Sequence, residues 1–243
     1  MIEKLRVDYQ LQSFLIRYLL ELRNFEIFIV VDDSGSMMTP VDETGKTRWD
    51  ELREIVKRIL PIAIMFDSNG VDIHFLNGAK FSRVKRIEDV EHAFARTPRD
   101  YTPLVPVLKR IFQSKMAARG RDKKLLVFVA TDGKPTNDDG EDAVNELEFL
   151  MRYIRNPKTT YVSFLLCTDD PECVGYLEGW DRTMDNVDVT DDYETEKEKI
   201  CRYQEDDNYP FTYNDYIVKA LVGSIVPYID RLNEHKVELA SNL

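Results

Sequence analysis

Residues 25–31 read FEIFIVV, and residues 32–36, which follow them, read DDSGS. The first run is rich in β-branched and aromatic side chains and becomes apolar on both faces toward Val31. This pattern predicts a central parallel strand that is covered on both sides. The apolar run stops at Asp32, so we expect a polar loop at the carboxyl end of the strand, which is where ligands bind in open parallel sheets.

Strand and helix patterns alternate along the rest of the chain. We expect further strands at residues 71–76, 80–84, 125–130, 161–166 and 187–189, with residues 80–84 as a short antiparallel edge strand. Helices are expected at about residues 49–63, 88–95, 103–118, 144–151, 174–180 and 214–234. Thr47 and Thr102 are the predicted caps of two of these helices, and Pro103 suits a first helical turn. The alternation predicts an α/β fold with a doubly wound, mostly parallel, Rossmann-like central sheet and helices on both faces.

The chain divides into three parts in this interpretation. Residues 1–23 form an extra N-terminal amphipathic helix, which either packs on the domain or serves as a dimerisation or docking helix. Residues 24–236 form one domain, because no linker rich in Gly, Pro or Ser interrupts them. Residues 237–243 form a C-terminal tail.

The composition argues against several classes of protein. The formal net charge of −11 disfavours nucleic acid and anionic membranes as partners. Neither a secretory signal nor a run of about 20 apolar residues is present, so we expect a cytoplasmic protein that does not span a membrane. The three cysteines fit no zinc spacing, and with three histidines they make a soft-ligand metal site an unattractive hypothesis. The acidic groups at residues 138–142, 194–198 and 205–207 are interpreted as solvated surface.

Three polar clusters fall at the expected carboxyl ends of strands or starts of helices. They are the Asp32, Ser34 and Ser36 loop, Thr102 at a helix start, and Asp132 after the strand at residues 125–130. Carboxylate and hydroxyl oxygens are ligands for a hard cation, so the sequence predicts a site for Mg²⁺, with Mn²⁺ or Ca²⁺ as alternatives. Two carboxylates balance a divalent charge, and an open coordination position would accept another anion, such as a carboxylate of a partner.

These residues resemble the metal-ion-dependent adhesion site of the von Willebrand factor A domain family. Residues 31–37, VDDSGSM, resemble its Asp-x-Ser-x-Ser element, residues 101–104, YTPL, its threonine loop with Tyr101 in place of the usual glycine, and residues 130–133, ATDG, its third element. Residues 48–49 and 187–192 also resemble intracellular bacterial and fungal members. The resemblance covers about residues 24–235 and leaves the N-terminal helix outside.

The resemblance implies a role for each of these residues. Ser34, Ser36 and Thr102 would meet the metal directly or through water, and Asp32 and Asp132 would do so in a way that depends on the conformational state. A glutamate or aspartate of a protein partner would be the last ligand, so the loops around Met37, Tyr101 and Gly133 would contact that partner. In several members the C-terminal helix shifts when the site is occupied; here that segment is residues 217–232.

We therefore expect a metal-dependent protein-binding module, or adaptor, and not an enzyme. The predicted site has no histidine or cysteine nearby to act as a base or nucleophile. The alternative hypothesis is a metal-dependent hydrolase of phosphoester or acyl substrates that uses the same ion as a Lewis acid, with Asp33 or Asp170 as the base.

Overall fold

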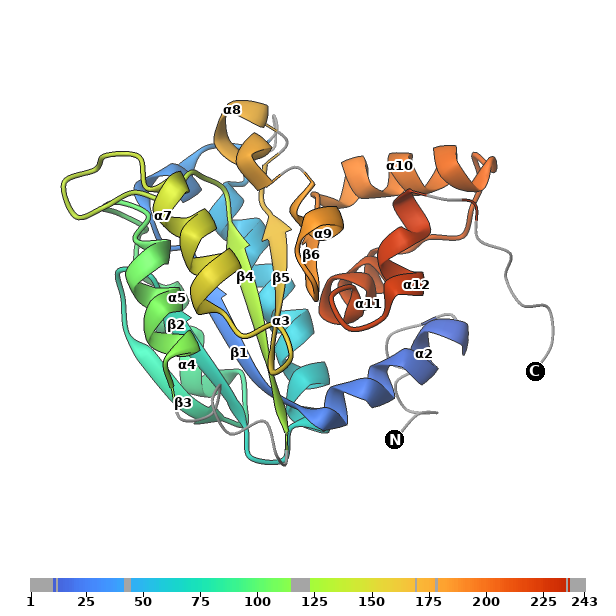
Figure 1. Ribbon diagram of the computed structural model, residues 1–243, viewed down its shortest axis with the longest axis horizontal. Coiled ribbons are helices and arrows are strands. Elements are labelled where there is room, and N and C mark those ends of the chain that lie inside the picture. Colours follow the sequence, from blue (N-terminus) through green and yellow to red (C-terminus); the bar gives the residue numbers. More distant parts are fainter. Residues whose placement is uncertain are drawn as a thin grey trace.

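The computed structural model has a six-stranded sheet at its centre, with the strand order β3-β2-β1-β4-β5-β6 (Figure 1). Every neighbouring pair is parallel except β2 and β3, which run antiparallel at the edge. The predicted α/β class and the mostly parallel, Rossmann-like sheet are therefore confirmed. The strands are β1 (Phe25–Val31), β2 (Val71–Phe75), β3 (Lys80–Val84), β4 (Lys124–Thr131), β5 (Thr160–Leu166) and β6 (Val187–Thr190).

The structure describes the chain in several parts, which are residue 11 and residues 13–41, 45–114, 123–168, 170–177, 179–234 and 236. The predicted tail at residues 237–243 and the first ten residues of the predicted N-terminal helix lie outside the described residues. Among the described residues, no helix is both long enough and apolar enough to cross a membrane.

Two hydrophobic cores lie on opposite faces of the sheet, because alternate residues of each central strand point to opposite sides. In β1, Ile27 and Ile29 belong to one core and Phe28 and Val30 to the other. The first core is covered by α3 (Arg48–Phe66), α4 (Glu88–Phe94) and α11 (Tyr213–Val222). The second is covered by α5 (Leu104–Phe112), α7 (Val144–Phe149), the π-helical turn η3 (Leu150–Ile154) and the short helices α8 (Pro171–Val174) and α9 (Trp180–Thr183). Figure 1 shows α5 and α7 in front of the sheet and α3 behind it.

The described part of the N-terminal helix packs on the domain. The helix α2 (Ser13–Leu19) and the 3₁₀ turn η1 (Leu20–Asn24) lead into β1. Leu15, Ile16 and Leu19 are buried in the same core as α11. For residues 13–19, the interpretation that the N-terminal helix packs on the domain therefore holds.

The turn between α3 and β2 depends on Gly70, and Gly70→Ala is expected to destabilise the fold. The φ angle of Gly70 is +92°, and an added Cβ atom would lie 2.6 Å from the backbone carbon of Arg83. An alanine here would have to adopt a left-handed backbone conformation, and its Cβ atom would clash with the backbone of Arg83. We therefore expect the free energy of unfolding to fall by about 1–3 kcal/mol. Urea unfolding measures it. Gly45→Ala is the control, because Gly45 has a φ of +77° but nothing within 4 Å of the added atom; an equal loss in both variants would show that the contact with Arg83 is irrelevant.

Two predicted features of the helices are wrong. Thr102 does not cap α5, because that helix begins at Leu104 with Pro103 as its N-cap residue. The helix expected at residues 214–234 is instead broken after Val222 and resumes as α12 (Pro227–Asp230) and the 3₁₀ turn η5 (Arg231–Asn233). Pro227 lacks the N–H that a continuous helix needs, which explains the break.

One of the acidic groups interpreted as solvated surface is also partly buried. Residues 194–198 lie in α10 (Tyr193–Gln204), and the side chain of Glu196 is fully buried there. The carboxylate of Glu196 lies 3.1 Å from the ammonium of Lys219, itself fully buried on α11. A charge run shows only how many charges are near one another, not which of them points inward.

Candidate functional site

The loops that follow β1 and β4 meet at the switch point of the strand order. The two strands pair in parallel with Val31 opposite Ala130, and the N–H of Asp32 donates to the carbonyl of Ala130 over 3.0 Å. From β1 the chain crosses to β2 on one side, and from β4 it crosses to β5 on the other. A crevice for a ligand is therefore expected between these two loops.

Four of the five predicted ligands form a continuous chain of hydrogen bonds. The N–H of Ser34 donates to Oδ1 of Asp32 over 2.9 Å, and the hydroxyls of Ser34 and Ser36 are 3.0 Å apart. The hydroxyl of Ser36 then donates to Oδ1 of Asp132 over 2.8 Å. Residues 96 positions apart in the chain are thus brought together at one edge of the sheet.

Thr102, the fifth predicted ligand, joins the site through its backbone. The N–H of Gly35 donates to the carbonyl of Asp100 over 3.1 Å, which holds the threonine loop beside the serine loop. The N–H of Thr102 donates to Oγ1 of Thr136 over 2.8 Å, and the N–H of Thr136 returns a bond to the carbonyl of Thr102. Thr102 is buried. The loops are adjacent, but the hydrogen bonds that fix Thr102 do not run to the other four side chains.

The two acidic side chains of the site are fully buried. Burial, and then the neighbouring charge of Asp132, raise the pKa of Asp32 to about 6, although hydrogen bonds from Ser34 and Thr131 oppose the shift. The hydroxyl of Thr131 donates to Oδ2 of Asp32 over 2.5 Å. Burial and the nearby charge of Asp132 thus make the charged form of Asp32 unfavourable, and nearby positive charge would stabilise it.

The donor chemistry of these residues suits a hard cation. Among the described residues, no group of three or more His, Cys, Asp or Glu side chains could hold a metal ion. The predicted set contains only two such residues, and hydroxyl oxygens make up the rest, a combination that fits Mg²⁺ or Ca²⁺ better than a soft metal.

Arg48 is a component of the site that sequence reasoning missed. Its Nη1 donates to Oδ2 of Asp132 over 2.9 Å, and its Nη2 donates to Oγ1 of Thr168 over 2.8 Å. Arg48 is the first residue of α3, and the capping box of Thr47 and Asp50 fixes that helix start. Nothing in the sequence pairs an arginine with an acid 84 positions away, so only the three-dimensional structure shows the contact.

The two acids considered as possible general bases have other roles. Asp33 accepts a hydrogen bond from the N–H of Asn77 over 2.7 Å. Asp170 accepts from the N–H of Glu172 over 3.0 Å and caps α8. Both carboxylates stabilise loops that border the site.

Apolar side chains are exposed on two of the three loops expected to contact a partner. The side chain of Met37 is fully buried, but its neighbour Met38 is 42% exposed. Tyr101 is 53% exposed, and its ring lies over Gly140, where an added Cβ atom would be 2.6 Å away. Gly133 is buried, and its carbonyl accepts a hydrogen bond from the hydroxyl of Tyr176.

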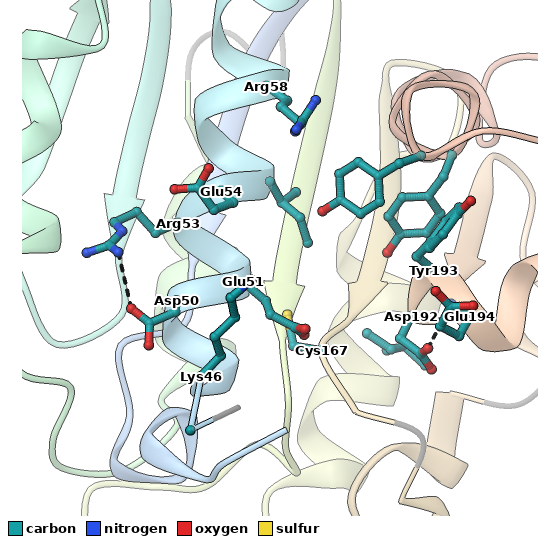
Figure 2. Close-up of a pocket in the computed structure, with 15 residues that line it drawn as sticks. Lys46, Asp50, Glu51, Arg53, Glu54, Arg58, Cys167, Asp192, Tyr193 and Glu194 are labelled. Carbon is teal, nitrogen blue, oxygen red and sulfur yellow. Dashed lines mark hydrogen bonds and ion pairs between the residues drawn. The ribbon is translucent and has the colours of Figure 1, made fainter. Parts of the chain in front are cut away.

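A groove of about 810 Å³ lies next to the site (Figure 2). One wall is α3 with the loop before it, and Figure 2 shows Glu51 and Arg58 on this side. The opposite wall includes Asp192 and Tyr193, and Cys167 lies between the two walls. The N–H of Cys167 donates to the carbonyl of Thr131, which directly precedes Asp132, so the floor of the groove adjoins the candidate site.

No family model and no curated protein matches this chain. Among solved structures, the chain is similar to proximal thread matrix protein 1 from the mussel byssus, with 17% identity, a TM-score of 0.39, and coverage of 58% of this chain and 37% of that one. It is also similar to the pilus adhesin SpaC from Lactobacillus rhamnosus GG in its open conformation, with 15% identity, a TM-score of 0.45, and coverage of 81% of this chain and 30% of that one. A second form of SpaC gives the same identity and TM-score. The chain spans about a third of the length of these proteins, and similarities this weak carry no argument about function.

Proposed function

We propose that this chain is a von Willebrand factor A-type binding module that holds one divalent cation and, through it, a carboxylate of a protein partner. Asp32, Ser34, Ser36, Thr102 and Asp132 would hold the ion, with Mg²⁺ favoured and Mn²⁺ or Ca²⁺ as alternatives. When bound, the ion supplies a positive centre that an aspartate or glutamate side chain of the partner can approach.

The observation that carries this proposal is the hydrogen-bond chain from Asp32 through Ser34 and Ser36 to Asp132. It brings two fully buried carboxylates and two hydroxyls together at the switch point of a parallel sheet. Buried acids are costly unless a cation is paired with them. A site that concentrates them beside neutral oxygen donors is therefore suited to holding a cation.

The surroundings of the site support binding over catalysis. Met38 and Tyr101 have exposed side chains on the bordering loops, where a docking protein partner would meet them. Asp33 and Asp170 are the two acids that a hydrolase would need as a base. Asp33 is hydrogen-bonded to the backbone N–H of Asn77 in the loop after β2, and Asp170 to that of Glu172 in its own loop. No specific observation favours the hydrolase hypothesis.

Thermal melting with and without metal tests the proposal. We expect Mg²⁺, Mn²⁺ or Ca²⁺ to raise the melting temperature of the wild type and to leave Asp132→Ala unchanged, because an ion that binds only the native state stabilises it. At about 100 times the Kd the gain is about 2.7 kcal/mol, and for a domain of this size each kcal/mol shifts the melting temperature by about 2–4 °C.

The control variant is Asp139→Ala, which removes an exposed acid from the loop that follows Asp132. It should respond to metal as the wild type does. If the wild type shows no shift with any of the three ions, in chloride or in acetate, or if Asp132→Ala shifts equally, the proposal is wrong. Metal-stimulated turnover of phosphoester or acyl substrates that is abolished by Asp132→Ala would replace it with the hydrolase hypothesis.

A further inference from the structure

The guanidinium of Arg48 already neutralises one of the two acids of the candidate metal site. Its Nη1 lies 2.9 Å from Oδ2 of Asp132, and only 14% of the Arg48 side chain is exposed. The other oxygen of Asp132 accepts from Ser36. Both oxygens of this carboxylate are therefore engaged by groups of the chain itself, one of them by a full positive charge.

The position of Arg48 is fixed on both sides. Its backbone N–H donates to the carbonyl of Thr39 over 3.0 Å, which ties the start of α3 to the loop that carries the serines. Its Nη2 donates to Thr168, just beyond the end of β5. The guanidinium is thus held between the two loops and is not a freely moving surface side chain, so its charge is a constant part of the site.

We propose that Arg48 makes metal binding depend on the partner's carboxylate, an inference that rests on the function proposed above. Asp32, Asp132 and Arg48 together carry one negative charge. A divalent ion would leave the site with one positive charge, which a single carboxylate cancels. Without Arg48, the two acids alone would balance the ion, and the loaded site would have no net charge with which to attract an acidic residue.

Two opposite effects on affinity follow from this charge balance. Arg48 weakens the binding of a cation by itself, because like charges repel and because it occupies an oxygen of Asp132. It strengthens the binding of a cation together with a carboxylate. By linkage, a carboxylate that tightens metal binding is itself bound more tightly by the same factor when metal is present. Arg48 would therefore bias the site against holding metal without a partner.

Titration with Mn²⁺, followed by the loss of its free electron paramagnetic resonance signal, tests this dependence. Each protein is titrated in chloride and in acetate at equal ionic strength, with acetate as the carboxylate probe and with its own weak binding of Mn²⁺ subtracted. We expect acetate to tighten Mn²⁺ binding by the wild type on the order of tenfold. Arg48→Met should bind Mn²⁺ more tightly than the wild type in chloride, by a similar factor, and should gain little from acetate.

Two further variants separate the charge of Arg48 from its shape, and a third serves as a control. Arg48→Gln keeps a hydrogen-bond donor without the charge and should behave like Arg48→Met, whereas Arg48→Lys should retain the wild-type dependence on acetate. Arg53→Met removes an arginine of the same helix that pairs with Asp50, outside the site, and should leave both titrations unchanged. Melting in the presence of a chelator reports whether each variant is folded.

The outcomes are distinct. Tighter Mn²⁺ binding by the Met and Gln variants in chloride, with the acetate effect lost, supports the proposal. Binding in chloride that is equal to or weaker than that of the wild type would mean that Arg48 merely positions Asp132, and the proposal would fail while the metal site stands. If the wild type binds no Mn²⁺ in either medium, the proposed function and this inference fall together.

Discussion

The Lys219→Met variant is expected to lose about 3–5 kcal/mol of folding free energy, because removing one partner of a buried ion pair leaves the other charge buried and uncompensated. Lys219 lies in the middle of α11 and is fully buried. Its ammonium is 3.1 Å from Glu196 of α10 and 3.8 Å from Asp188 of β6, and both of these acids are also fully buried. One cation thus joins two helices to the last strand of the sheet.

The pKa values of this cluster explain why the loss should be large. Burial alone would lower the pKa of Lys219, but the charges of Glu196 and Asp188 outweigh it and raise that pKa above its ordinary value. Burial, and then the charge of Asp188, raise the pKa of Asp230 to about 9, so Asp230 stays protonated near pH 7. Lys219 is therefore left to balance Glu196 and Asp188. Without Lys219, both carboxylates would have to be protonated or exposed to water.

Urea unfolding at pH 7 measures the loss in Lys219→Met. The matched control is Lys57→Met on α3, which removes a lysine from an exposed pair with Glu54 and should change stability by less than about 0.5 kcal/mol. A double variant, Lys219→Met with Glu196→Gln, should recover part of the lost folding free energy because it also removes one of the two uncompensated buried charges. If Lys219→Met loses less than about 1 kcal/mol, this cluster is not what joins α10 and α11 to β6.

The sequence predicted the part of the candidate site that follows from strand order. Asp32 and Asp132 each come just after an apolar strand, and the carboxyl ends of neighbouring parallel strands meet at one edge of a sheet. Ser34 and Ser36 are expected near Asp32 because they come directly after it in the same short loop. Their convergence needs no information beyond the alternation of strands and helices, which the apolar runs carry plainly.

Arg48 and Lys219 could not be predicted in the same way. Arg48 lies among other charged residues at the start of α3, whereas Lys219 follows the apolar Ile217 and Val218 in α11. In neither case does the helical pattern say which distant acid the cation faces. Pro227 marks the helix break in the sequence, but the close packing at Gly223, just after Val222, was hidden. An added Cβ atom on Gly223 would lie 2.3 Å from Oδ1 of Asp188, so the helix end is packed against a buried carboxylate that only the fold brings there.

The Asp32→Asn variant is expected to show two effects of opposite sign. Without metal it should be more stable than the wild type, because burial beside Asp132 makes the charge of Asp32 unfavourable, as its pKa of about 6 indicates. A shift of about two pKa units corresponds to about 3 kcal/mol at neutral pH, so we expect a gain of about 1–3 kcal/mol. An asparagine can still accept the hydrogen bond from the N–H of Ser34. With Mg²⁺ or Mn²⁺, the stabilisation seen in the wild type should disappear.

Asp67→Asn distinguishes this result from the general effect of neutralising a buried acid. Asp67 is also fully buried, but its Oδ1 lies 3.1 Å from the ammonium of Lys123, and its Oδ2 accepts from the N–H of Ile27. Neutralising an acid that is already paired with a cation should destabilise the protein. Asp67→Asn should therefore lower the melting temperature in the presence of a chelator, while the variant should still respond to metal. If Asp32→Asn is instead destabilised without metal, the two buried acids at the switch point are already compensated within the chain. The site would then have no electrostatic need for a divalent ion.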